Sequence, residues 1–183
     1  MQRDRSSKDI PIITQLKTND GDELMEFIRG WDQECIQLAK GKFEWETCII
    51  KIGDFQFSEE FYGSPALFRG STPSGTFGIA IPKVVLGETL YGGNIISKDY
   101  CVTGNCDRYL DLRCGAITSF FVVVVPIKRI LAYAEQMQLP LTRKQLLRPG
   151  IIVPIPTALN QLSSYFEELL TLANNQTYSI TDN

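Results

Sequence analysis

The sequence contains no histidine among its 183 residues. Histidine is the usual general base of catalytic triads, and three-histidine metal sites are common on small β-barrels. Its absence excludes both kinds of site. We therefore expect a protein that is not an enzyme, with no catalytic residues, no metal site and no cofactor.

Positive charge is also scarce. Lysine and arginine total 18 against 21 aspartates and glutamates, so the formal net charge is −3 and the pI is about 5.1. Binding to the phosphate backbone of nucleic acids requires an excess of positive charge. The densest basic cluster, formed by Arg143, Lys144 and Arg148, is typical of a solvated helix face. This chain alone is not expected to bind nucleic acid.

Long apolar runs are missing. The longest, Phe120 to Pro126, is too short to cross a bilayer. The charged start MQRDRSSKDIP lacks the apolar core of a secretory signal. An odd number of cysteines without an export signal is typical of a reducing compartment. These features predict a cytoplasmic protein with no membrane partner.

The five cysteines are Cys35, Cys48, Cys101, Cys106 and Cys114. Cys101 and Cys106 flank a short turn and are within disulfide reach if they face each other across a hairpin. A zinc site built on Cys101, Cys106 and Cys114 would need a fourth ligand from Cys35, Cys48 or a carboxylate. We expect small buried thiols instead.

Hydrophobic residues make up 44% of the chain and charged residues 21%, values that are typical of one globular domain. Residues 1–20 are polar and show no period, so they are expected to be flexible. From Asp22 onward a helical spacing connects apolar residues as far as Leu38. Gly30 either divides this helix in two or lets its second half become extended.

Short apolar runs separated by turn residues fill the middle of the chain and predict an antiparallel sandwich or barrel. The opening of this region holds two expected strands, at 43–52 and 55–62. The stretch LFRGSTPSGTFGIAIP is interpreted as a hairpin at 67–82. Further strands are predicted at 84–86, 89–91, 95–96, 99–102, 109–112 and 117–125. The run SFFVVVVP does not alternate, so it is expected to be covered on both faces.

The last third of the chain has a helical period. One helix is predicted at 127–137, and a connector at 140–156 has room for one further helical turn. The next helix, 157–173, carries a narrow apolar stripe at steps of three and four: Leu159, Leu162, Phe166, Leu169 and Ala173. This stripe either packs on the preceding helix or pairs with its own copy in a homodimer. A homodimer is the partner that we predict.

Four stretches together resemble a known family: GWDQECIQLAKGKFE, FQFSEEFY, LFRGSTPSGTFGIAIP and the two helices after SFFVVVVP. They are similar to the N-terminal half of AraC-type (AraC/XylS) transcription regulators, over residues 22–173. The resemblance implies a cupin-like antiparallel β-barrel, preceded by one helix and followed by two. Its expected parts are a flexible segment 1–20, a barrel 21–126, dimerisation helices 127–175 and a tail or linker 176–183.

The same resemblance implies an effector-sensing and dimerisation domain without its helix-turn-helix half. DNA would be contacted only through that absent part. We expect an excised sensor half rather than a free-standing relative, because the helix at 157–173 ends where a linker would begin. Two rival interpretations stay open: a small cupin-type, isomerase-like enzyme, and a dimerisation scaffold whose barrel is filled with side chains.

A small-molecule effector in such a barrel would contact a predicted set of side chains: Arg69, Trp45, Tyr62, Tyr91 and Tyr109. Arg69 offers a planar fork of donors to an anionic or carbonyl-bearing effector. Alternatively, it pairs at the surface with Glu59 or Glu60. These two carboxylates are adjacent on a strand and point to opposite faces, so they cannot flank a substrate together.

Overall fold

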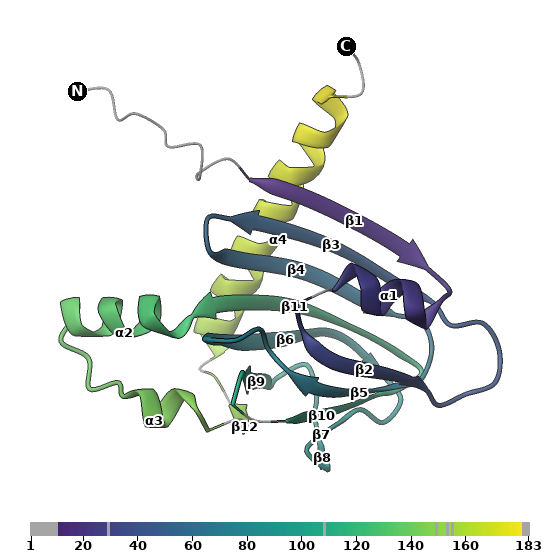
Figure 1. Ribbon diagram of the computed structural model, residues 1–183, viewed down its shortest axis with the longest axis horizontal. Coiled ribbons are helices and arrows are strands. Elements are labelled where there is room, and N and C mark those ends of the chain that lie inside the picture. The colour runs from purple at the N-terminus through teal and green to yellow at the C-terminus, as the bar shows by residue number, and fades with distance from the viewer. Residues whose placement is uncertain are drawn as a thin grey trace.

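The computed structural model describes residues 11–28, 30–107, 109–148, 150–152, 154 and 156–180, with side chains up to Leu172. These residues form two antiparallel sheets and four helices (Figure 1). The larger sheet has seven strands in the order β1-β3-β4-β11-β6-β9-β12. Its strands are β1 (Ile12–Thr18), β3 (Trp45–Ile52), β4 (Phe55–Tyr62), β11 (Ile117–Pro126), β6 (Thr76–Leu86), β9 (Cys101–Asn105) and β12 (Gly150–Ile152).

The smaller sheet has five strands in the order β2-β5-β10-β7-β8. These are β2 (Asp32–Gln37), β5 (Ala66–Ser71), β10 (Leu110–Cys114), β7 (Leu90–Tyr91) and β8 (Asn94–Ile95). The main apolar core draws buried side chains from both sheets, including Trp45 and Phe120 of the larger sheet and Phe68 and Cys114 of the smaller one. The predicted mostly β fold is thus confirmed as two antiparallel sheets with helices. Among the described strands, the two sheets do not close into a barrel.

The stretch at 67–82 does not form the predicted hairpin. β5 pairs with β2 and β10 in the smaller sheet, whereas β6 pairs with β11 and β9 in the larger one. The turn between them therefore carries the chain from one sheet to the other. It is closed at Thr76, whose backbone N–H and hydroxyl both donate to the Pro73 carbonyl, at 3.1 and 2.6 Å.

The first helix, α1 (Gly21–Phe27), begins at Asp20, whose carboxylate accepts from the Asp22 backbone N–H at 2.8 Å. A continuous helix to Leu38 is not formed. Gly30 has a φ of +104°, and the chain then extends into β2. Within the segment predicted to be flexible, residues 12–18 form β1, which pairs along its whole length with β3.

Three helices follow the last long strand. They are α2 (Ile127–Gln136), α3 (Arg143–Leu146) and α4 (Pro156–Ile180). α2 and α3 share a small apolar cluster with Phe77, the second residue of β6. α4 continues beyond residue 175, into the segment predicted to be a tail, and crosses the outer face of the larger sheet (Figure 1).

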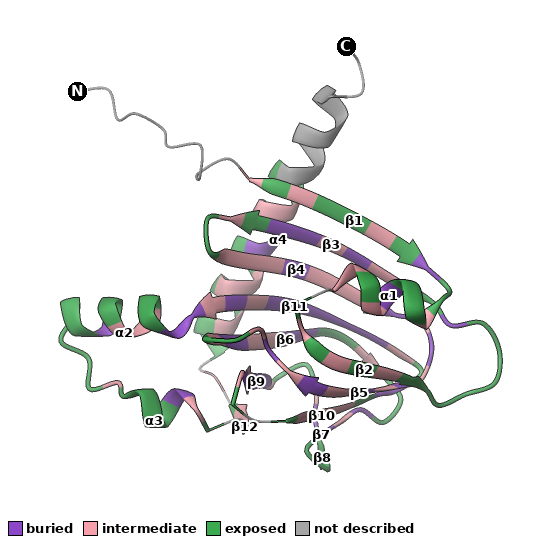
Figure 2. Ribbon diagram, viewed as in Figure 1, coloured by how far each residue is buried: buried purple, intermediate pink, exposed green. Residues whose placement is uncertain are grey.

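Three residues of the predicted stripe, Leu159, Leu162 and Phe166, pack on this sheet and, among the described residues, belong to no cluster with the preceding helix. Phe166 stacks on Phe121 of β11, with ring centroids 5.0 Å apart, and meets Phe57 of β4 edge-on. β11 is buried on both faces along most of its length, as its unbroken apolar run predicts (Figure 2). Phe121 lies under α4, and Phe120 faces the other sheet.

Candidate functional site

A cavity of about 80 Å³ lies between the two sheets. It is about half as large as an engineered apolar cavity that admits benzene. Its wall is mostly apolar and aromatic, with a few polar groups. The lining residues are Leu24, Ile28, Trp31, Gln33, Trp45, Ile49, Gln56, Glu60, Tyr62, Phe68, Thr72, Gly78, Ile79, Ala80, Tyr91, Val102, Gly104, Leu110, Leu112 and Val122.

The polar groups come mainly from strand β4, which reads FQFSEEFY. In a strand, alternate side chains point to opposite faces. α4 covers the face that carries Phe57, so Gln56, Glu60 and Tyr62 point inward to the cavity. β4 thus directs Gln56, Ser58 and Glu60 inward and its phenylalanines, together with Glu59, outward. This is nearly the reverse of the usual pattern for a strand with one solvated face.

Glu60 is the acidic group of this cavity. Its carboxylate accepts a hydrogen bond from the Tyr62 hydroxyl at 2.5 Å and another from the Ser58 hydroxyl at 3.1 Å. The Glu60 side chain is half-buried and lines the cavity. Burial raises the pKa of Glu60, because a low-dielectric interior disfavours its charged form, and the two hydrogen bonds offset part of that rise.

Aromatic side chains form much of the remaining wall. The rings of Tyr62 and Phe68 are 4.7 Å apart, and the Tyr91 hydroxyl donates to the Thr103 carbonyl at 2.5 Å. The indole N–H of Trp45 is buried beside the Tyr62 hydroxyl and has no hydrogen-bond partner among the described residues. Burial raises the pKa of Tyr91 to about 12 and that of Tyr62 well above its ordinary value, so both phenols stay neutral.

Small residues on the larger sheet keep the cavity open. Gly78 and Ala80 of β6 and Gly104 of β9 line it with little side-chain volume. A Cβ at Gly104 would lie 3.5 Å from side-chain atoms of Leu110 and Thr72, which is an ordinary contact distance. Larger residues at these positions would therefore fill the space.

Helix α1 covers one side of the cavity. It connects β1, an edge strand of the larger sheet, to β2, an edge strand of the smaller one. Leu24 of α1, together with Ile28 and Trp31 just after it, contributes to the lining. A movement of this short helix would change access to the interior.

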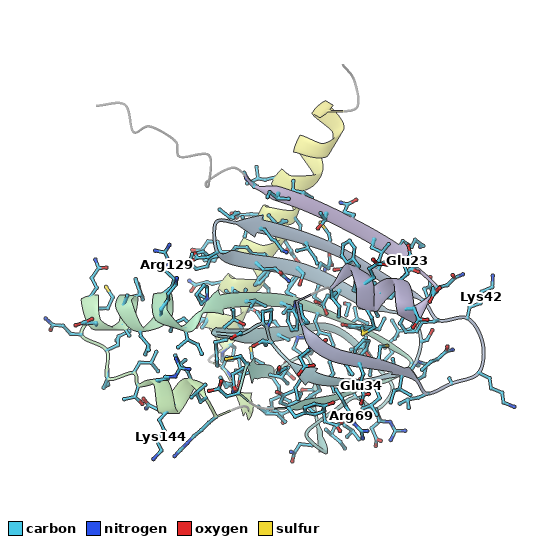
Figure 3. The ribbon with its side chains drawn as sticks, viewed as in Figure 1. Glu23, Glu34, Lys42, Arg69, Arg129 and Lys144 are labelled. Carbon is cyan, nitrogen blue, oxygen red and sulfur yellow. The ribbon has the colours of Figure 1, made fainter. Side chains whose placement is uncertain are left out.

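Of the predicted ligand-binding residues, Trp45, Tyr62 and Tyr91 line the cavity, and Arg69 and Tyr109 do not. Arg69 alternates with the inward-facing Phe68 and Gly70, so it lies on the outer face of the smaller sheet, opposite Glu34 of β2 (Figure 3). There its guanidinium binds Asp111 at 3.1 Å. The surface ion pair is formed, but neither Glu59 nor Glu60 is its partner. Tyr109 is 64% exposed.

Glu60 is the site residue that sequence reasoning missed. The opposite orientation of Glu59 and Glu60 was predicted correctly: Glu59 binds Lys83 on the outer side, whereas Glu60 faces the cavity. The signal that could have found it is the pattern of β4, in which three polar residues alternate with phenylalanines. A long amphipathic helix later in the chain offers a cover for the phenylalanine face.

The described residues contain no group of three or more histidine, cysteine or acidic side chains placed to hold a metal. All five cysteines are free thiols, and burial raises the pKa of Cys35 to about 12. Cys101 and Cys106 belong to different apolar clusters.

The comparisons with known proteins give no relative: no family model, curated protein or solved structure matches this chain. Within the described part of the chain, none of the helices has both the length and the apolar character needed to cross a membrane.

Proposed function

We propose that this chain is the effector-sensing and dimerisation domain of an AraC-like transcription regulator, built on a cupin-like arrangement of its sheets. The observation that carries the proposal is the cavity between the sheets, with a carboxylate and several aromatic rings directed into it. A scaffold filled with side chains would not need such a space. The effector is a small molecule, and DNA is contacted through a separate part of the regulator.

Two strands of the larger sheet connect the cavity on its inner face with α4 on its outer face, and they offer a route for a binding signal. β4 carries Glu60 on its inner face and Phe57, which contacts Phe166 of α4, on its outer face. β11 likewise places Val122 in the cavity wall and Phe121 under α4. An effector that binds one arrangement of these strands more tightly shifts the population of α4 positions, by no more than its differential affinity.

Dimerisation is proposed through the side of α4 that faces away from the sheet. Of the predicted dimer residues, Leu159, Leu162 and Phe166 are occupied by the sheet within one chain. Ala173 lies outside the described side chains. A second apolar stripe, at steps of four and three, remains on the outer side: Tyr165, Leu169 and Leu172. Tyr165 and Leu172 are 62% and 61% exposed, so this stripe is accessible to a second copy.

A reporter assay tests both parts of this proposal. The chain is fused to a monomeric DNA-binding domain that represses its operator only as a dimer. We expect repression by the fusion, loss of repression in Leu172→Glu, and modulation by compounds that bind the cavity. A fusion that never represses, combined with a monomeric mass in light scattering, would contradict the dimer.

One observation also favours a second candidate function, that of a small cupin-type enzyme. A carboxyl group with a raised pKa that accepts a hydrogen bond from a buried tyrosine is a suitable general acid or base. Such an enzyme would convert the bound compound, and conversion would be lost in Glu60→Gln. Chromatography of ligand mixtures after long incubation distinguishes the two functions, because a sensor returns its ligand unchanged.

A further inference from the structure

We infer that the effector is a small apolar amine, whose ammonium group binds the Glu60 carboxylate while its hydrocarbon part fills the aromatic cavity. The inference rests on the proposed role of the cavity as an effector site, and it adds the chemical class of the ligand. It also replaces the sequence-based expectation of an anionic or carbonyl-bearing effector held by Arg69, which lies on the outer face of the smaller sheet.

The charge of the cavity wall selects a cation. Glu60 is the acidic side chain of the lining, and the described lining residues include no lysine or arginine. An anionic ligand would meet a like charge without a compensating partner, which is expensive in a low-dielectric interior. An ammonium ion instead supplies the opposite charge that a buried carboxylate needs.

The hydrogen-bonding capacity of Glu60 leaves room for this ligand. One carboxylate oxygen accepts from Ser58 and the other from Tyr62. Each oxygen has two lone pairs, so each can accept one more donor. Gln33 and Gln56 also line the cavity, and no hydrogen bond among the described residues involves either side-chain amide. An ammonium group with three donors can use these free acceptors.

The aromatic wall favours the same ligand class. Trp31, Trp45, Tyr62, Phe68 and Tyr91 all line the cavity. The negative faces of aromatic rings attract cations, most strongly where water is excluded. The carbon skeleton of an alkylamine gains by burial against the same rings. A cavity of about 80 Å³ limits the ligand to a few non-hydrogen atoms, about the size of a short alkylamine.

The ionisation of Glu60 makes binding depend on pH. The described residues also place Tyr62 of β4, Tyr91 of β7, Cys35 of β2 and Cys114 of β10 in or beside this interior. Burial raises the pKa of all four, so they remain neutral near pH 7. Glu60 therefore sets the pH dependence. Below its raised pKa the Glu60 carboxyl is protonated and must lose its proton before it can bind the ammonium ion. The affinity for the amine therefore falls about tenfold for each unit by which the pH is lowered.

The protein contains its own reporter for the test, because both tryptophans of the chain, Trp31 and Trp45, line the cavity. Tryptophan emission is followed while the full chain is titrated with isobutylamine, isobutanol or isobutyrate. These compounds share one carbon skeleton and differ in their polar group. Two variants are compared. Glu60→Gln removes the charge in the cavity, and Glu59→Gln is the control that removes the charge of the neighbouring residue on the opposite face of β4.

We expect isobutylamine to change the emission with saturation. Its affinity should fall about 10- to 100-fold in Glu60→Gln, the range expected for loss of a charge-assisted hydrogen bond. It should stay within about twofold in Glu59→Gln. If Glu60→Gln does not fold, the decline of wild-type affinity below the Glu60 pKa gives the same test.

Two results would overturn the inference. If isobutanol or isobutyrate binds as tightly as isobutylamine, the ligand class is wrong and the cavity still serves as an effector site. If no compound of any of these classes, nor any in a broad small-molecule library, changes the emission or gives heat in calorimetry, both the ligand class and the proposed effector site fail.

Discussion

The Tyr62 hydroxyl donates a 2.5 Å hydrogen bond to the Glu60 carboxylate inside the cavity between the two sheets. Both side chains come from the inner face of β4, two residues apart. The bond stabilises the charged form of Glu60, while burial destabilises it more strongly and raises the pKa. The unliganded protein therefore keeps a carboxyl group in a position that is costly without a partner.

The first prediction concerns the pH dependence of stability. A carboxyl whose pKa is raised by folding stabilises the native state fully below its unfolded-state pKa. This contribution is lost as the pH rises from that value through the folded-state pKa. Glu60→Gln keeps the acceptor for Tyr62 and removes the charge. We expect the variant to be more stable than wild type at pH 7. Above the ordinary glutamate pKa, its free energy of unfolding should also change less with pH than that of the wild type.

Urea denaturation of both proteins between pH 4 and pH 8 measures this difference, in which each unit of pKa shift corresponds to about 1.4 kcal/mol. Glu59→Gln is the matched control, since Glu59 binds Lys83 on the outer side of the same strand. A Glu60→Gln variant that is less stable than wild type at pH 7 would contradict the assigned effect of burial.

The second prediction concerns the contact of α4 with the larger sheet. Phe166 is 2% exposed and contacts Phe121 and Phe57. Phe166→Ala should lower the free energy of unfolding by about 3 kcal/mol or more. Tyr165→Ala, on the exposed side of the same helix, should change it by less than about 0.5 kcal/mol. Equal effects in chemical denaturation would mean that α4 does not pack on the sheet in solution.

The third prediction separates folding from dimerisation. Leu172→Glu places a charge in the proposed dimer seam, and it should yield a folded monomer in light scattering. Leu162→Glu buries a charge against the sheet of its own chain and should lower stability instead. A Leu172→Glu protein that remains dimeric would place the interface elsewhere on the molecule.

The fourth prediction concerns Gly70, where β5 passes close to β2. Its φ is +148°, and a Cβ there would lie 1.9 Å from the Asp32 carbonyl oxygen. Gly70→Ala should therefore cost about 3 kcal/mol or more, because backbone atoms must move. Gly75 has a φ of +75°, and a Cβ added there would meet no atom within 4 Å, so Gly75→Ala should cost only about 1 kcal/mol. Thermal melts of the two variants test this order.

The strands with clear turn signals at their ends were predictable from the sequence. Residues 55–62 alternate between polar and apolar, follow Gly53-Asp54, and form β4 with the predicted bounds. β2 was harder to predict, because Trp31, Cys35 and Leu38 also fit a helical period. Its pairing with β5, distant in sequence, decides in favour of a strand. β1 is an edge strand that is mostly exposed and pairs with β3, so its own residues carry little signal of their partner.

The candidate site was partly predictable. Trp45, Tyr62 and Tyr91 are aromatic residues within predicted strands, and all three line the cavity. The charge of Arg69 suggests a ligand contact, but its position between Phe68 and Gly70 directs it outward. The inward direction of Glu60 depends on which face of β4 is covered by α4. The pattern of β4 indicates two different faces, but the contact that decides which face is inside joins segments about a hundred residues apart.

The measurement that tests the central claim most directly is the titration of Glu60 itself. The ¹³C signal of its side-chain carboxyl, assigned by its absence in Glu60→Gln, is followed against pH with and without isobutylamine. We predict a midpoint above the ordinary glutamate value in the free protein and a lower midpoint when the amine is bound. An ordinary midpoint in the free protein, or one that isobutylamine does not move, would contradict the account of Glu60 as the buried anchor of the effector.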